Sequence, residues 1–386
     1  MASTFSFVNQ YVIVISLLLS TLICNVNGCF TSIFSFGDSI SDTGNLLGLQ
    51  LSGSLNSTHV DFLPYGSTFF HHPTGRASDG RLVIDFIAEA LGLPFVRPFF
   101  GSKKRESENF QKGVNFAIIG ATAIDYAFYE EQSEIDAGPT NISLGAELEY
   151  FKKFLTSLCS SDSDCKQLLQ NSLILMGEIG GNDYDFAFFR GIKVEEIIRE
   201  FVPRVIQSIA SAINELIELG AVTFLVPGNF PIGCSPAKLT LYQDSNKEDY
   251  DPLTGCITWL NQFAEFQNKL LQKELDQIRK LHPHVNIIYV DYYNLLMRFY
   301  QSPSQYGFKE TLKACCGGGG PYNANPSMIC GDPGATNCDD PSSYVSWDGM
   351  HYTEATHRWI AKTVLEQLSS LCPPLTMNMH KSVFSS

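Results

Sequence analysis

Short apolar runs alternate with longer amphipathic stretches along this chain of 386 residues. Five runs have the length and composition of buried strands, and they span residues 32–36, 114–117, 173–176, 222–226 and 286–290. Apolar residues recur with a helical period over residues 82–91, 194–219, 260–281 and 353–368. Strands that alternate with helices predict an α/β fold, in which a parallel sheet is flanked by helices.

Proline and glycine mark the breaks in this pattern. Pro203 is expected to kink or divide the helical stretch 194–219, and Gly220 to end it. The longest irregular segment spans residues 313–345, where Gly317–Gly320 is expected to be locally mobile unless disulfides fix it. No internal repeat is present.

Four short blocks supply the residue types of an ester-hydrolysing site. Gly37-Asp38-Ser39 follows the first apolar run, and Asp348-Gly349-Met350-His351 precedes the last helical stretch. Residues 115–121 and 180–183 lie between them. A serine at a strand end can present its hydroxyl, and a histidine three residues after an aspartate can share a turn with it. We therefore predict Ser39 as nucleophile, His351 as general base and Asp348 as the group that orients the imidazole.

The same blocks offer donors for an oxyanion. The predicted donors are the backbone N–H groups of Ser39 and Gly120 and the side-chain amide of Asn182. Taken singly, each block has a plainer interpretation, such as a helix cap, a turn or a buried strand. Their order on one chain favours a functional site. Because no Gly-x-Ser-x-Gly surrounds Ser39, the α/β-hydrolase nucleophile elbow is disfavoured.

Other residues that could bind a metal or line a pocket have plainer interpretations. His71 and His72 lack partners at metal-ligand spacing, so a pair of loop residues is expected. Several phenylalanines are candidates for an acyl pocket, although core packing is the default for most: Phe69, Phe70, Phe99, Phe100, Phe186, Phe188 and Phe189. Phe186–Phe189 stay more open as pocket residues because they closely follow Asn182.

Composition limits the partners. The formal net charge of −14 and the pI near 5.0 argue against non-specific binding to nucleic acid or to anionic membrane surfaces. The hydrophobic fraction of 44% is enough for a large core. Because the catalytic blocks come from both ends of the chain, we expect one domain spanning residues 29–386.

The N-terminal segment is typical of a signal peptide. Residues 1–28 contain no Lys, Arg, Asp or Glu, and residues 12–24 form an apolar run too short to span a bilayer comfortably. Small residues before Cys29 provide a cleavage site, which predicts a secreted protein. The alternative is a retained anchor. No later segment is long and apolar enough for stable membrane insertion.

Cysteine usage agrees with secretion. Of 11 cysteines, cleavage after Gly28 removes Cys24 and leaves an even number, as a disulfide framework requires. The expected pairs are Cys159 with Cys165, Cys234 with Cys256, two bridges among Cys315, Cys316, Cys330 and Cys338, and a clasp between Cys29 and Cys372. A zinc site within residues 315–338 is the alternative. The sequons at Asn56 and Asn141 predict N-linked glycans, although a sequon can go unused.

The ordered blocks resemble the SGNH hydrolases, and specifically the plant GDSL esterase/lipase family. Further matching stretches include Ser41–Asn45, Pro64-Tyr65-Gly66, Pro73–Arg76, Ser78–Arg81 and Val226-Pro227-Gly228. Ile40 stands where the motif name has leucine. Residues 175–183 and 225–235 look like the subgroup of sinapine esterase and acetylajmalan esterase. The resemblance implies an SGNH-hydrolase-like, flavodoxin-like three-layer sandwich.

The expected function is a secreted serine esterase that acts through an acyl-enzyme and needs no cofactor or metal. The subgroup resemblance suggests small esters of specialised metabolites, such as choline, hydroxycinnamoyl or acetyl esters. Two alternatives stay open. An acyltransferase would use the same acyl-enzyme with an alcohol in place of water, and a binding protein would keep the fold without turnover.

Overall fold

The computed structural model describes residues 29–55, 59–101, 110–131 and 138–372. The predicted signal peptide and the sequon at Asn56 therefore lie outside the described residues. Within these ranges, none of the helices has both the length and the apolar character to cross a bilayer.

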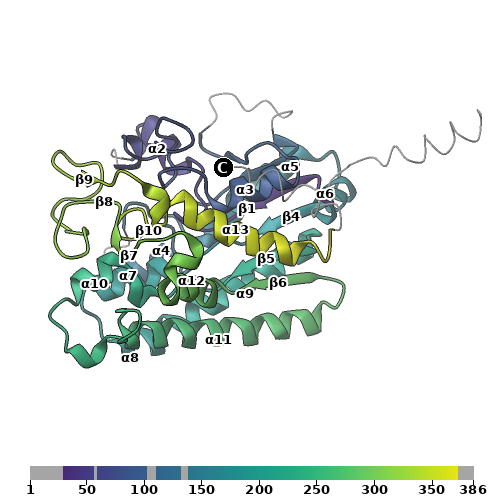
Figure 1. Ribbon diagram of the computed structural model, residues 1–386. Coiled ribbons are helices and arrows are strands. Elements are labelled where there is room, and N and C mark those ends of the chain that lie inside the picture. The colour runs from purple at the N-terminus through teal and green to yellow at the C-terminus, as the bar shows by residue number, and fades with distance from the viewer. Residues whose placement is uncertain (1–28, 56–58, 102–109, 132–137, 373–386) are drawn as a thin grey trace, which may run out of the picture.

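A six-stranded parallel sheet forms the centre of the molecule, with strand order β2-β3-β1-β4-β5-β6 (Figure 1). Its strands are β1 (Ser32–Ser35), β2 (Arg97–Pro98), β3 (Gly113–Asn115), β4 (Ser172–Leu175), β5 (Thr223–Pro227) and β6 (Asn286–Val290). The predicted α/β class and all five predicted strands are confirmed, with ends displaced by at most two residues. The sequence did not indicate β2, a two-residue edge strand too short to show a periodic pattern.

Helices cover both faces of the sheet. They are α2 (Asn45–Leu51), α3 (Val83–Ala90), α4 (Tyr126–Glu131), α5 (Leu144–Leu158), α6 (Asp162–Gln170), α7 (Gly181–Phe189), α8 (Val194–Glu200), α9 (Val202–Leu219), α10 (Pro236–Leu241), α11 (Thr258–Leu281), α12 (Tyr292–Gln301) and α13 (Glu354–Leu368). Short 3-10 turns occupy His59–Asp61, Ile232–Cys234, Lys247–Asp249, Pro303–Tyr306 and Pro341–Ser343.

Side chains that alternate along the strands pack into two separate hydrophobic cores. Phe34 of β1 packs in the core that α5, α9 and α11 complete. Ile33, the neighbouring residue of the same strand, packs in the core that α3, α12 and α13 complete. Alternation along a strand sends successive side chains to opposite faces, so the sheet is buried on both sides. This produces the three-layer arrangement of helices, sheet and helices.

The predicted break in the stretch 194–219 is confirmed. The stretch divides into α8 and α9 at Phe201, with Pro203 in the first turn of α9, where a missing N–H costs no helical hydrogen bond. Gly220 ends α9 in the left-handed conformation with φ 115°. Thr353 caps α13, because its side chain accepts a hydrogen bond from the Thr356 N–H.

The segment predicted as irregular contains more order than its sequence indicates. Strand β7 (Glu310–Ala314) pairs in parallel with β10 (Tyr344–Ser346), and β8 (Cys316–Gly317) pairs with β9 (Thr336–Asn337). Such short strands show no detectable period in the sequence. The bridges from Cys315 to Cys338 and from Cys316 to Cys330 hold this segment in place.

Five disulfides agree with the expected pairs. The bridges join Cys29 to Cys372, Cys159 to Cys165, Cys234 to Cys256, Cys315 to Cys338 and Cys316 to Cys330. The four sulfur atoms that the zinc alternative would need are therefore consumed in two bridges. The bridge from Cys29 to Cys372 ties the start of the described chain to the segment that follows α13.

This terminal bridge should contribute most to stability. It closes a loop of 343 residues, whereas the bridge from Cys159 to Cys165 closes a loop of 6. In the chain-entropy view, replacing both cysteines of the terminal bridge by serine should lower the free energy of unfolding by ~6 kcal/mol, against ~2 kcal/mol for the short loop. Urea unfolding of the two double variants measures this difference. Equal losses would contradict the loop-length argument.

Candidate active site

The predicted blocks meet at one edge of the sheet. Ser39 follows β1, Gly120 follows β3 and Asn182 follows β4, and in a parallel sheet these carboxyl ends lie side by side. His351 reaches the same edge from the turn before α13. Ser39, Asn182 and His351 line one pocket.

The turn that carries Ser39 depends on Gly37. Its φ is 127°, and a Cβ at this position would lie 2.8 Å from the carbonyl oxygen of Glu178. Only glycine fits such a conformation and such a close approach. The Ile40 N–H then donates to Asp38 Oδ1 at 3.0 Å, which closes the turn around Ser39. Ser39 itself is largely buried.

A buried carboxylate joins this turn to the segment after β3. Asp42 accepts backbone N–H bonds from Gly44, Asn45 and Leu46 at the start of α2. Its Oδ2 also accepts the N–H of Ile119 at 3.0 Å. The segment before Gly120 is therefore fixed relative to the turn that carries Ser39.

His351 and Asp348 form a hydrogen-bonded pair. Nδ1 of His351 lies 2.8 Å from Oδ2 of Asp348, and Oδ1 of Asp348 accepts the backbone N–H groups of Met350 and His351. Although burial opposes ionisation, these partners hold the pKa of Asp348 at about 2. Burial lowers the pKa of His351, but the charge and hydrogen bond of Asp348 outweigh it and raise that pKa above 6.5. Asp348 is thus ionised and oriented toward the imidazole.

Within the described residues, no direct hydrogen bond joins the Ser39 hydroxyl to His351. Both groups border the same pocket, and in many enzymes this contact forms only once substrate is bound. The structure therefore shows the pair of His351 and Asp348 and places Ser39 on the same pocket as His351, while a bond between Ser39 and His351 stays a prediction.

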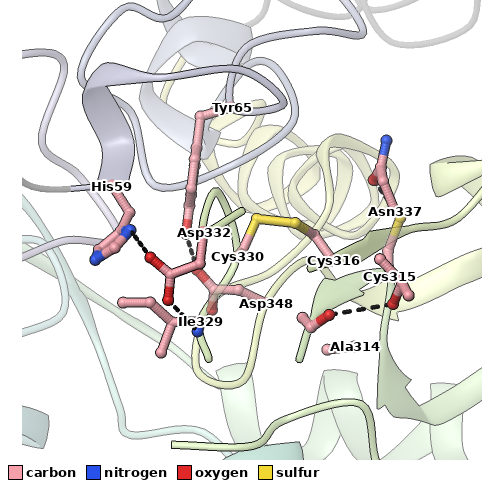
Figure 2. The surroundings of a disulfide bond; sticks show 12 residues. His59, Tyr65, Ala314, Cys315, Cys316, Ile329, Cys330, Asp332, Asn337 and Asp348 are labelled. Carbon is pink, nitrogen blue, oxygen red and sulfur yellow. Dashed lines mark hydrogen bonds and ion pairs between the residues drawn. A yellow bond between two sulfur atoms is a disulfide. The ribbon is translucent and has the colours of Figure 1, made fainter. Parts of the chain in front are cut away.

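A fourth donor to Asp348 comes from the other end of the chain. The hydroxyl of Tyr65 donates to Oδ2 of Asp348 at 2.9 Å (Figure 2). Tyr65 lies in the Pro64-Tyr65-Gly66 motif, to which sequence reasoning assigned no role. A signal was present in the motif match, but only the fold brings these residues together.

The predicted oxyanion donors differ in their availability. The backbone N–H groups of Ser39 and Gly120 have no acceptor among the described residues. By contrast, the Asn182 amide already donates to Oδ2 of Asp38 at 3.1 Å and to the carbonyl of Ala121 at 2.9 Å. To serve an oxyanion, Asn182 must share or release one of these bonds, a constraint that the sequence did not reveal.

Asp38 belongs to a carboxyl pair beside the pocket. Burial raises the pKa of Asp38. Burial, followed by the neighbouring charge of Asp38, raises the pKa of Glu178 well above its usual range. A hydrogen bond links the two side chains, and this bond requires a proton on one of the two carboxyl groups. Glu178 also accepts the N–H of Gly181 at 3.2 Å, which connects the pair to the turn that carries Asn182.

The residues that line the pocket include a buried ion pair. Nζ of Lys238 lies 2.8 Å from Oδ1 of Asp185 and 3.9 Å from the ring centre of Phe189. The pocket therefore contains three carboxyl groups and one ammonium. Sequence reasoning missed Glu178, Asp185 and Lys238, because a lone charged residue carries no motif.

The aromatic residues of this pocket are Phe230 and Tyr352. Phe186–Phe189, which the sequence left open as pocket residues, are not among the residues that line this pocket: Phe188 is buried against Phe263, and Phe189 lies against the Lys238 ammonium. His71 and His72 lie in an exposed loop, as expected, with their Nδ1 atoms near backbone carbonyls of Ser67 and Phe70.

Comparison with known proteins agrees with this geometry. Residues 33–364 match the family described as GDSL-like Lipase/Acylhydrolase. The chain is 55% identical over 369 residues to GDSL esterase/lipase At1g28610 of Arabidopsis thaliana, covering 95% of this chain and 94% of the relative. It is 54% identical over 338 residues to sinapine esterase of Brassica napus, covering 87% and 85%. The chain therefore belongs to the GDSL lipase/acylhydrolase family and is a carboxylic ester hydrolase.

Proposed function

We propose that this hydrolase is a secreted serine esterase whose triad is Ser39, His351 and Asp348. The observation that carries the proposal is the 2.8 Å hydrogen bond between His351 and Asp348, at a pocket that Ser39 also lines. In this arrangement the carboxylate fixes the tautomer that leaves Nε2 of His351 free to accept a proton. The proposal treats residues 29–386 as one catalytic domain, supported by the single sheet that both cores share.

The reaction has two stages. Oγ of Ser39 attacks the ester carbonyl as Nε2 of His351 takes its proton, and the carbonyl electron pair moves onto oxygen. The backbone N–H groups of Ser39 and Gly120 receive this oxyanion, with Asn182 as third donor once it yields a bond to Asp38 or Ala121. Collapse breaks the ester bond, and His351 protonates the leaving alkoxide. Water then repeats the sequence on the acyl-enzyme and releases the acid.

The proposed substrates are esters of small specialised metabolites, of the choline, hydroxycinnamoyl or acetyl type. The pocket has a volume of about 60 Å³, well below the ~150 Å³ of a cavity that holds benzene, so an acetyl group fits it better than a long alkyl chain, and a hydroxycinnamoyl ring would have to extend beyond it. Because Lys238 pairs with Asp185 and a proton is shared between Asp38 and Glu178, one negative charge remains in the pocket lining, which favours a polar or cationic alcohol. A screen over acyl length and alcohol charge tests this; preference for long-chain neutral esters would contradict it.

Secretion and glycosylation belong to the same proposal. Five disulfides favour an oxidising compartment. Asn141 is exposed, as an N-linked glycan requires, while Asn56 lies outside the described residues. Mass spectrometry of the mature protein tests both the start near Cys29 and the glycan at Asn141.

Replacing Ser39 by alanine should abolish ester hydrolysis and leave the fold intact. The hydroxyl borders the pocket and makes no hydrogen bond on which the packing depends. Turnover should fall by ~10⁵-fold or more, as when a triad serine is removed. Steady-state hydrolysis of an activated acetate ester measures the loss, and a serine-directed phosphonate should label the parent protein only. Labelling of another serine would contradict the assignment.

The pH profile should report His351. The imidazole must be neutral to accept the proton of Ser39, so kcat/KM should fall as pH drops through a His351 pKa above 6.5. Asp348→Asn removes the charge that raises this pKa, so the acid limb should move to lower pH while turnover falls by ~10⁴-fold. Rate profiles over pH 4–9 check both shifts. A flat profile across this range would exclude His351 as the base.

A further inference from the structure

Asp348 is held by more donors than the triad itself requires. Its Oδ2 accepts both Nδ1 of His351 and the hydroxyl of Tyr65, at 2.8 and 2.9 Å. Its Oδ1 accepts two backbone N–H groups from its own turn. The backbone bonds fix one oxygen within the turn, whereas Tyr65 is the contact that fixes the other oxygen from outside it.

Tyr65 is suited to this task by its surroundings. Its side chain is buried, and its ring packs edge-on against Trp347, with ring centroids 5.8 Å apart. Burial, followed by the charge of Asp348, raises the pKa of the phenol well above 10, so the hydroxyl keeps its proton and remains a donor throughout the working range of a histidine base.

The segment around Tyr65 is docked on the disulfide-linked loop near Asp348. Nδ1 of His59 lies 3.4 Å from Asp332, and Asp332 follows Cys330, whose sulfur is bonded to Cys316 (Figure 2). The Cys316 N–H donates to the carbonyl of Trp347 at 2.7 Å, directly before Asp348. The donor and the acceptor are thus carried by two segments that are braced against each other.

We propose that Tyr65 is a positioning residue, whose hydroxyl holds the Asp348 carboxylate in the orientation that His351 needs. The inference rests on the proposed triad. Sharing Oδ2 also moderates the pull of Asp348 on the imidazole, because an accepted hydrogen bond stabilises the carboxylate and weakens its demand for a cationic partner. The other charge that raises the pKa of His351 is that of Asp185, which lines the same pocket, while burial lowers the pKa of His357 on α13 to about 3 and leaves that ring uncharged.

Tyr65→Phe tests this with the least disturbance, since the ring and its contact with Trp347 remain. We expect kcat to fall by about 10-fold, the scale of one hydrogen bond to a charged group, with KM little changed. The acid limb of kcat/KM should move to higher pH, opposite to the shift in Asp348→Asn. Tyr250→Phe is the matched control: its hydroxyl donates to the carbonyl of Tyr242 at 2.7 Å, away from the pocket, and its loss should leave kcat and the acid limb unchanged.

A double-mutant cycle separates positioning from packing. In the Asp348→Asn background, Tyr65→Phe should cost less than about 2-fold, because the carboxylate that it positions is gone. The same 10-fold loss in both backgrounds, or an unmoved acid limb with a loss that follows melting temperature, would overturn the proposal and leave Tyr65 as a packing residue.

A measurement without turnover keeps the two proposals distinguishable. In Ser39→Ala protein, NMR titration of the His351 ring gives its pKa directly, and adding Tyr65→Phe should raise that pKa. An unchanged pKa overturns the role of Tyr65 even if the enzyme is a serine esterase. Conversely, esterase activity that survives Ser39→Ala would overturn the proposed function, while a raised pKa would still support the link between Tyr65, Asp348 and His351.

Discussion

Buried carboxylates that accept backbone N–H bonds hold the candidate site together. Asp42 accepts four of them, three from the start of α2 and one from Ile119 after β3. Asp183 does the same between the turn after β4 and residues 123–124, where Tyr129 adds its hydroxyl. A buried charge is tolerated only when it is hydrogen-bonded in this way, and each such carboxylate fixes two strand-end turns relative to each other. The positions of the proposed nucleophile and oxyanion donors depend on this alignment.

The second requirement is that the two ends of the chain meet. Arg81 pairs with Glu354 at 2.8 Å, and Asp79 accepts the Glu354 N–H at 2.7 Å, so the start of α13 is docked on the segment before α3. Arg76 binds Asp85 through two parallel bonds of 2.8 and 2.7 Å and so fixes that segment. These contacts explain the Pro73–Arg76 and Ser78–Arg81 motifs as supports of the site. They bring the loop that holds His351 within reach of the turn that holds Ser39.

The electrostatics of the pocket add a constraint of their own. Asp38 and Glu178 share a proton beside the Asn182 amide, and Asp185 is neutralised by Lys238. The shared proton leaves this pair with one negative charge instead of two, which limits the repulsion of an oxyanion that forms nearby. The Tyr65 hydroxyl plays a related part for Asp348, since it satisfies a buried carboxylate that must remain ionised.

The parallel sheet, the division of α8 from α9, three of the five cysteine pairs and the four blocks that carry Ser39, Gly120, Asn182, Asp348 and His351 were predictable from the sequence. These features are local: a strand shows its apolar run, a break shows its proline, and a motif keeps its spacing whatever surrounds it. The pairing among Cys315, Cys316, Cys330 and Cys338 was left open and is settled by the fold. Tertiary structure alone decided that Tyr65 would donate to Asp348, that both N–H bonds of Asn182 would be occupied, and that Glu178, Asp185 and Lys238 would line the pocket. Each of these contacts joins residues far apart along the chain or depends on burial. A local pattern of residues shows neither which distant residues meet in space nor which side chains lose their contact with solvent.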